Sequence, residues 1–181
     1  RTRKIIENLP EGFTVVALDE SFFFYDSLVR KVWIEEGKRP VAIVTGSHMH
    51  SCVFGALSLD GRQLFRQYGI FNEDTFKDFL KLVYYKFKRL YLFLDKAGQH
   101  YRSEKVQAYF DSHKGSLIPI WLPTASPEFM PLEGCWNISK DALLVKSCYP
   151  SFTEFKGSVG GYLRTKRFNL DIRKHLLGEA G

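Results

Sequence analysis

The sequence predicts an α/β domain with a mixed sheet, and the order of its segments is the basis for this prediction. Strand-like runs separated by short turns come first, up to residue 67. Helical and strand-like segments then alternate up to residue 122, and helical segments end the chain. Strands joined by tight turns pair antiparallel, whereas strands joined through a helix pair parallel. With 181 residues and no repeats or low-complexity linkers, the chain is most simply one domain, residues 1–181.

The first part of the sheet is predicted from short apolar runs bounded by polar residues, which are typical of buried strands. Asp60-Gly61 stands between two such runs, and an Asp-Gly pair in this position is a strong hairpin signal. In chain order, the strand candidates are residues 13–19 with the apolar continuation 22–25, the short edge candidate 31–34, and the runs 41–44, 52–57 and 62–67.

From residue 72 the hydrophobic period changes from that of a strand to that of a helix. Apolar residues from Phe76 to Phe87 recur at helical spacing, and Asn72 is a suitable N-cap. Pro119 indicates an edge strand or an irregular ladder, because proline cannot donate to the ladder of a sheet. The remaining predicted elements are strand 90–95, helix 103–114, strand 117–122, a helix of about 15 residues from Leu132, and helices 151–164 and 170–177.

Composition limits the classes of protein to which the chain can belong. Its 45% hydrophobic and 25% charged residues are typical of a globular protein, and a net charge of +6 is compatible with a polyanionic partner. Cys52, Cys135 and Cys148 lack Cys-x-x-Cys spacing, which argues against structural zinc and disulfides and favours the reducing cytosol. No apolar stretch approaches the length of a membrane span. Because the chain begins with Arg1 rather than Met, we expect it to be a piece of a longer protein.

Three acidic residues stand where a metal-dependent site would need them. Asp19 ends the run 13–19, Asp95 ends the run 90–95, and Glu133 lies at the head of a predicted helix. In an open α/β sheet, ligands gather beyond the carboxyl ends of parallel strands. Two strands that each deliver an aspartate to one edge bring their charges together, and a cation is needed to offset the repulsion. A divalent-metal site is therefore the leading hypothesis, and an ordinary polar strand end is the alternative for each aspartate alone.

Longer segments around these acids resemble the three catalytic blocks of mariner-superfamily transposases, and most closely those of the prokaryotic insertion-sequence branch. The 37 residues between Asp95 and Glu133 add to the resemblance, which extends from Val15 to Lys146. The three blocks are Val16-Ala-Leu-Asp-Glu20, Leu92-Phe-Leu-Asp-Lys-Ala-Gly-Gln-His100 and Leu122-Pro-Thr-Ala-Ser-Pro-Glu-Phe-Met-Pro-Leu-Glu133.

The sequence departs from the pattern of these transposases at three positions. Lys96 stands where the family has Asn after the second aspartate, and Met130 replaces the Asn before Pro-x-Glu. Gly134 is an unusual continuation after Glu133, because glycine in a helix interior costs roughly 1 kcal/mol relative to alanine. The three acids are retained, so metal binding is expected, whereas the departures leave open a catalytically silent relative.

The resemblance implies a ribonuclease H-like fold, with a mixed five-stranded sheet of three antiparallel and two parallel strands flanked by helices. Asp19 would lie on the central first strand, Asp95 at the end of the neighbouring fourth strand, and Glu133 on the helix after the fifth. The three acids would hold two Mg²⁺ or Mn²⁺ ions, with Asp19 bridging both. The implied activity is that of a transposase, which cleaves a DNA strand and transfers the freed 3′ end to target DNA.

The implied partners are transposon ends and target DNA, bound by a homodimer or a higher assembly. A helix-turn-helix region would precede Arg1, residues 1–12 would be a linker remnant, and residues 150–181 would be C-terminal helices. A cytoplasmic, nucleoid-associated location without membrane contact follows from the same resemblance.

Most of the net charge lies in the last quarter of the chain, where eight basic residues after Ser139 exceed four acidic residues and leave +4. A surface that contacts phosphates is one interpretation, and its affinity would fall steeply with added salt. A solvated helix face is the other. The residues predicted to contact DNA are Lys96, His100, Arg102, Lys140, Lys166 and Arg167.

Two other functions remain open from the sequence alone. Another ribonuclease H-like nuclease, such as a ribonuclease or a junction resolvase, would use the same acids without strand transfer. A catalytically silent DNA-binding relative would retain the fold alone. The Ser-Pro-x-x-x-Pro-x-Glu loop that ends at Glu133 favours a transposase over other nucleases.

Overall fold

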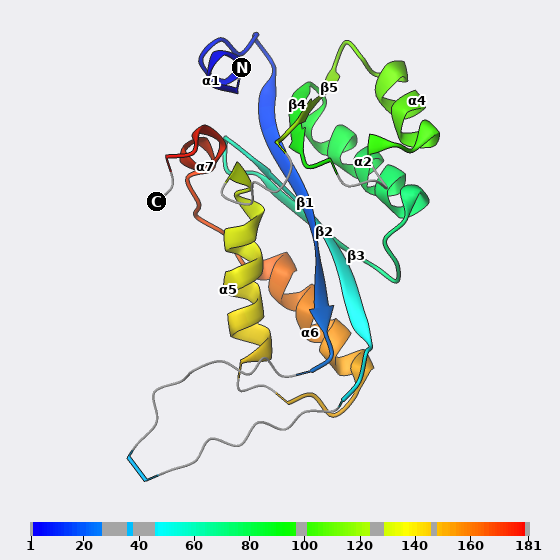
Figure 1. Ribbon diagram of the computed structural model, residues 1–181, viewed down its shortest axis with the longest axis vertical. Coiled ribbons are helices and arrows are strands. Elements are labelled where there is room, and N and C mark those ends of the chain that lie inside the picture. Colours follow the sequence, from blue (N-terminus) through cyan, green and yellow to red (C-terminus); the bar gives the residue numbers. More distant parts are fainter. Residues whose placement is uncertain are drawn as a thin grey trace.

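The computed structural model describes residues 2–26, 36–37, 46–96, 101–123, 129–145 and 148–179. The strand candidates 31–34 and 41–44 and the Ser-Pro loop at 124–128 lie outside these residues. The described strands are β1 Thr14–Phe24, β2 His50–Ser58, β3 Gln63–Tyr68, β4 Leu90–Leu94 and β5 Leu117–Trp121. They form one five-stranded sheet in the order β3-β2-β1-β4-β5 (Figure 1).

The sheet is mixed, as the sequence predicts. β2 pairs antiparallel with both β1 and β3, whereas β4 pairs parallel with both β1 and β5. β5 lies at an edge, which suits Pro119 because an edge strand can leave one backbone position without a donor. The runs 13–19 and 22–25 belong to the single strand β1, which therefore continues beyond Asp19.

Helices cover both faces of the sheet (Figure 1). They are α1 Thr2–Glu7, α2 Glu73–Phe87, α4 Glu104–Ser112, α5 Leu132–Leu144, α6 Phe152–Thr165 and α7 Ile172–Leu177. α2 and α4 pack on the face that carries Val16 and Leu18, while α5, α6 and α7 pack on the face that carries Val15 and Ala17. This division follows from the period of two along a strand. Among the described residues, no helix is both long and apolar enough to span a membrane.

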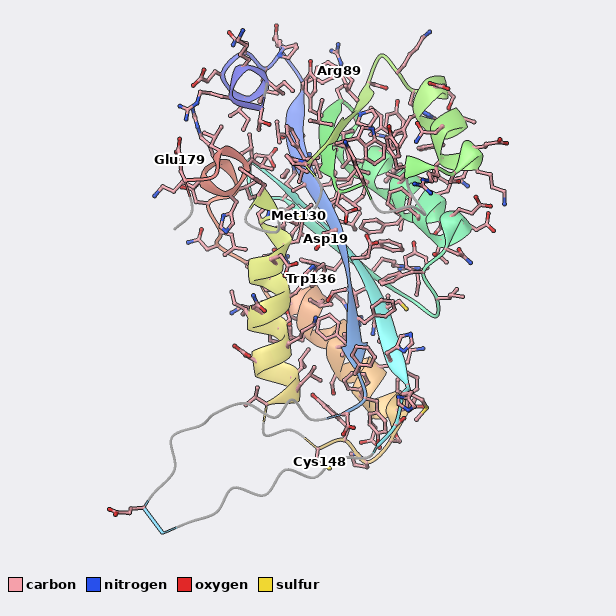
Figure 2. The ribbon with its side chains drawn as sticks, in the orientation of Figure 1. Asp19, Arg89, Met130, Trp136, Cys148 and Glu179 are labelled. Atoms are coloured by element: carbon pink, nitrogen blue, oxygen red, sulfur yellow. The ribbon has the colours of Figure 1, made fainter. Side chains whose placement is uncertain are left out.

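The N-terminal segment is a packed part of the fold. A linker remnant was expected over residues 1–12, but Thr2–Glu7 form α1, which contacts α7. Ile6 is buried in the core on the α5 side of the sheet, and an apolar helix face of this kind must find a partner surface. Arg3 Nη2 also lies 2.7 Å from the carboxylate of Glu179, which Figure 2 labels. The two ends of the described chain therefore meet at one end of the sheet.

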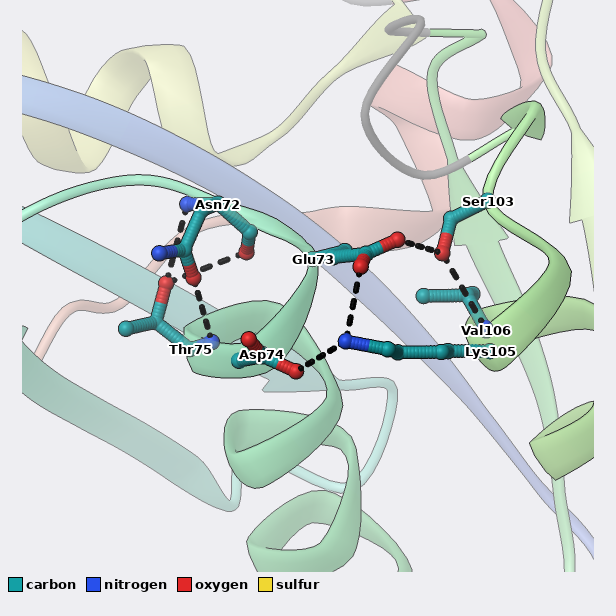
Figure 3. A network of polar contacts seen from close by, with 7 residues as sticks. All are labelled: Asn72, Glu73, Asp74, Thr75, Ser103, Lys105 and Val106. Carbon is teal, nitrogen blue, oxygen red and sulfur yellow. Dashed lines mark hydrogen bonds and ion pairs between the residues drawn. The ribbon is translucent and has the colours of Figure 1, made fainter.

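The two helices on the opposite face are tied together at their N-termini (Figure 3). Asn72 caps α2 as predicted, because its side chain accepts a hydrogen bond from the Thr75 backbone N–H at 2.9 Å. Ser103, the N-cap of α4, donates to Glu73 Oε2 at 2.8 Å. Lys105 Nζ lies 2.9 Å from Glu73 Oε1, and this ammonium group lowers the pKa of Glu73. The acidic first turn of α2 therefore also holds the start of α4.

Two glycines of α6 differ in how closely they approach β3. A Cβ at Gly157 would meet nothing within 4 Å, whereas a Cβ at Gly160 would meet Gln67 Oε1. Gln67 cannot move aside freely, because its side-chain amide donates to Ser51 Oγ at 2.9 Å and to the Lys156 carbonyl at 3.1 Å. The pair therefore offers a matched test of helix packing.

We expect Gly157→Ala to raise the free energy of unfolding by about 0.5–1 kcal/mol, the difference in helix propensity. Gly160→Ala should instead lower it by about 1–3 kcal/mol, because the added methyl group overpacks the contact with Gln67. Urea unfolding followed by circular dichroism measures both variants against the wild type. Equal stabilisation by the two substitutions would contradict the close packing of α6 on β3.

Candidate active site

The sheet places Asp19 and Asp95 at the same level of two neighbouring strands. The parallel ladder between β1 and β4 pairs Ala17 with Phe93. The same offset, continued by two residues, brings Asp19 level with Asp95, which directly follows β4. Alternation along a strand puts both acids on the face that α5 covers. Asp19 is half-buried and Asp95 is exposed.

Helix α5 approaches the sheet closely beside Asp19. In the antiparallel ladder between β1 and β2, Asp19 pairs with Gly55. A Cβ at Gly55 would lie 2.5 Å from Leu132 Cδ2 and 2.7 Å from Trp136 Cη2, closer than real side chains pack. Glycine is therefore required at this point of β2. The missing side chain sets how near the helix that carries Glu133 comes to the sheet.

Trp136 holds the carboxylate of Asp19 (Figure 2). Its indole Nε1–H donates a hydrogen bond to Asp19 Oδ2 at 2.8 Å, and Trp136 itself is only 2% exposed. A buried tryptophan needs an acceptor for its single N–H, so the contact satisfies the indole and orients the carboxylate. Sequence reasoning missed Trp136. Its position three residues after Glu133, on the same side of a predicted helix, is the signal that could have found it.

The surroundings of Asp19 disfavour its negative charge. Burial raises the pKa of Asp19 from 3.8 to about 7, and the hydrogen bond from Trp136 opposes this rise. The negative charges of Glu20 and Glu133 raise the pKa of Asp19 further. A cation bound beside them would favour the ionised form of Asp19.

The donor set at this place fits a hard divalent cation. Carboxylate oxygens are ligands that Mg²⁺ and Mn²⁺ prefer, and Asp19 is a partly buried carboxylate with acidic neighbours. Within the described parts of the chain, no three His, Cys, Asp or Glu side chains are arranged to hold one ion. The register of β1 and β4 thus brings Asp19 level with Asp95, while the convergence of Asp19, Asp95 and Glu133 stays a prediction.

Two of the three departures from the transposase pattern have packing explanations. Met130 is 5% exposed and belongs to the core on the α5 side of the sheet, so it acts as a core residue. A Cβ at Gly134 would lie 3.1 Å from Leu170 Cδ1, in the segment between α6 and α7. The cost of this glycine in helix propensity is therefore offset by close packing. Lys96 is exposed beside Asp95, and nothing in the structure explains this third departure.

The residues predicted to contact DNA occupy separate places. His100 lies outside the described residues. Lys140 belongs to α5, and its Nζ lies 5.7 Å from the centre of the Phe23 ring on β1. The other four are exposed, with Lys96 and Arg102 between β4 and α4, and Lys166 and Arg167 directly after α6.

A five-stranded mixed sheet in this order, with helices on both faces, is a ribonuclease H-like fold. A comparison with protein families identifies the particular family. Residues 14–156 match the DDE superfamily endonuclease family, and the chain belongs to it. No curated protein sequence matches the chain significantly.

Solved structures confirm the predicted fold. The Mos1 strand transfer complex is similar with a TM-score of 0.64 and 14% identity, over 91% of this chain and 50% of that one. The mariner Mos1 paired end complex with Mg is similar with a TM-score of 0.64 and 16% identity, over 92% of this chain and 53% of that one. The simian T-cell lymphotropic virus intasome, in complex with PP2A regulatory subunit B56 gamma, is similar with a TM-score of 0.54 and 9% identity. The match covers 86% of this chain and 50% of that one. The chain thus spans about half the length of these solved chains.

A methyl group added to Gly55 tests whether α5 rests on the sheet at this point. We expect Gly55→Ala to lower the free energy of unfolding by about 1–3 kcal/mol, because Leu132, Trp136 and Phe65 would all have to move. Gly115→Ala is the matched control, since Gly115 is exposed and a Cβ there would meet nothing within 4 Å. Chemical unfolding measures both variants, and a similar small effect of the two would contradict the close approach of α5.

The raised pKa of Asp19 predicts a pH dependence of stability. The folded chain holds this proton up to about pH 7, whereas the ordinary pKa is 3.8, so ionisation costs stability as the pH rises between these values. Relative to Asp19→Asn, which does not titrate, the wild type should lose about 2–4 kcal/mol of unfolding free energy from pH 4 to pH 8. Urea unfolding in EDTA at several pH values measures the difference. Parallel curves for the two proteins would show that burial does not perturb Asp19.

Proposed function

We propose that the chain is the catalytic domain of a DNA transposase of the mariner superfamily, from the prokaryotic insertion-sequence branch. The domain cleaves a DNA strand at an element end and joins the freed 3′ end to target DNA. One observation carries the proposal: a partly buried Asp19, oriented by Trp136 and influenced by Glu133, lies level with Asp95. Membership of the DDE superfamily endonucleases and the three sequence blocks support the same activity.

In this proposal Asp19, Asp95 and Glu133 would hold two Mg²⁺ or Mn²⁺ ions. When bound, such a pair of ions supplies Lewis acidity at the attacking and leaving oxygens of a phosphoryl transfer. Asp19 is the most buried of the three acids, and together with Asp95 and Glu133 it would supply the carboxylate oxygens that hold the ions. Mos1 complexes with Mg and with Mn are among the similar solved structures, which supports a divalent metal here.

Other residues of the chain prepare the site for this chemistry. The Trp136 indole fixes the orientation of Asp19, so that this ligand needs little rearrangement when it binds a cation. Glu133 lies in the first turn of α5, where the helix dipole stabilises its negative charge. Lys96, exposed beside Asp95, is assigned to a backbone phosphate as a point charge.

The proposed partners are transposon ends and target DNA, bound by a homodimer or a larger assembly. The similar Mos1 structures are paired-end and strand transfer complexes, and this property of Mos1 supports the proposal. Because the chain spans about half of those chains, we assign sequence-specific binding of element ends to a helix-turn-helix region outside this domain. A cytoplasmic, nucleoid-associated location belongs to the same proposal.

The activity can be tested directly with Mn²⁺ and plasmid DNA that carries the ends of the element. The protein should nick or join this DNA, and Asp95→Ala should slow the reaction by at least about 10³-fold, because a lost metal ligand removes several kcal/mol of transition-state stabilisation. Gel electrophoresis measures nicked and joined products. Asp111→Asn is the matched control, since Asp111 is an exposed carboxylate of α4, on the opposite face of the sheet from α5.

Unchanged activity of Asp95→Ala would reject the proposal. Cleavage of an RNA–DNA hybrid without strand transfer would instead assign the chain to another kind of ribonuclease H-like nuclease. A catalytically silent relative is distinguished by calorimetric titration with Mn²⁺, because the absence of binding at millimolar metal would support silence.

A further inference from the structure

A groove of about 580 Å³ lies at the outer edge of β3, away from the three acids. Within the described sheet, β3 is an end strand and pairs with β2 alone. Both α2 and α6 contact this strand, one from each face of the sheet (Figure 1). Side chains from both faces line the groove, with Lys86 from α2 and Arg164 from α6.

The described lining of this groove contains four cations and no acid. All four cations are exposed. The ion pairs between described residues involve Arg3, Arg62 and Lys105, so none of the four groove cations pairs with a described carboxylate. Like charges gathered around one hollow repel each other, and a bound polyanion relieves that repulsion. The four cations are Arg66, Lys86, Arg164 and Arg167.

Two glutamines of β3 fix the geometry of the groove. The side-chain amide of Gln63 donates to the Lys166 carbonyl, and its Oε1 accepts from the Phe168 N–H at 3.2 Å. The amide of Gln67 donates to the Lys156 carbonyl at 3.1 Å. These bonds hold α6 and the segment after it against β3. Hydrogen bonds therefore fix the position of the cations of α6 relative to those of β3.

The groove continues a row of residues that starts at Asp19. Asp19 pairs with Gly55 across β1 and β2, and Gly55 pairs with Phe65 across β2 and β3. Phe65 lines the groove, and its ring lies 5.7 Å from the ring of Trp136, which holds Asp19. Two strand spacings, roughly 10 Å, separate the backbones of β1 and β3. A polymer that is bound at Asp19 can therefore reach the groove.

We propose that this groove binds the phosphate backbone of duplex DNA beside the cleavage site. Three of its four cations are arginines, which bind phosphate through paired N–H groups. Proteins that bind single strands use exposed aromatic platforms, whereas Phe65, the one aromatic residue of the described lining, packs against Trp136 and Phe168. The choice of DNA as the polyanion rests on the proposed function.

The test compares two variants that each lose three positive charges. Binding of a short fluorescent duplex of arbitrary sequence is measured by anisotropy, in EDTA, over a range of salt concentrations. The groove variant carries Arg66→Gln, Arg164→Gln and Arg167→Gln, and the control variant carries Lys81→Gln, Lys114→Gln and Lys174→Gln, three exposed lysines outside the groove.

The groove variant should bind the duplex on the order of 100-fold more weakly at about 0.1 M salt. The slope of log K against log salt should become shallower by about 2–3, because each phosphate contact contributes about 0.9. The control variant should change this slope by less than about 1. If the triple groove variant does not fold, Arg66→Gln and Arg164→Gln alone should each reduce the slope by about 0.9.

Equal losses in the two triple variants, or an unchanged slope in the groove variant, would overturn the proposal. Single-stranded DNA that binds as tightly as the duplex would overturn the assignment to a duplex. The assay contains no metal and requires no cleavage, so its failure is separate from failure of the proposed function. If cleavage depends on Asp95 but the groove variant binds DNA normally, the proposed function stands and only the proposal that the groove binds DNA is refuted.

Discussion

The close contact between α5 and the sheet at Gly55 is the constraint on which the rest of the site depends. Because Gly55 has no side chain, Leu132 and Trp136 of α5 can pack directly on β2, at the residue that pairs with Asp19 of β1. This approach brings the Trp136 N–H to 2.8 Å from the Asp19 carboxylate, and brings Glu133 near enough to raise the pKa of Asp19. A helix held one methyl group further out could do neither. The site is thus assembled by packing, against the mutual repulsion of its acids.

The fold tolerates this repulsion because the surrounding core is extensive. The first five residues of β1 are buried, with Val15 and Val16 fully inaccessible, and burial of apolar surface is the main favourable term in folding. The single hydrogen bond from Trp136 offsets only part of the cost of burying a carboxylate, since the pKa of Asp19 still rises to about 7. Natural proteins keep such costs mainly where function requires them. A cation is the simplest compensation for a partly buried carboxylate whose charge Glu20 and Glu133 disfavour.

The parts of the structure with local signals were predictable, and the parts made by distant contacts were not. Hydrophobic period and the Asn72 cap predicted α2, and apolar runs ending in acids predicted the strands of Asp19 and Asp95. By contrast, the Trp136–Asp19 bond joins residues 117 apart, and the Arg3–Glu179 pair joins residues 176 apart. No signal in either segment of such a pair encodes its partner. Gly134 was interpreted as an anomaly for the same reason, because its explanation, Leu170, lies beyond another helix.

The separation of basic groove and acidic site has a physical consequence for both. The pKa of Asp19 is shifted by its burial and by Trp136, Glu20 and Glu133, so among the described residues no cation acts on it. Arginines placed directly against Asp19 would favour its ionised form and compete with a metal ion for its oxygens. In the structure the aromatic pair Phe65 and Trp136 stands between the groove and the carboxylate instead. The two strand spacings between β1 and β3 are comparable with the screening length of about 10 Å at 0.1 M salt. Under the two proposals, the basic groove can therefore attract phosphates while the carboxylate oxygens of Asp19 stay available to a cation.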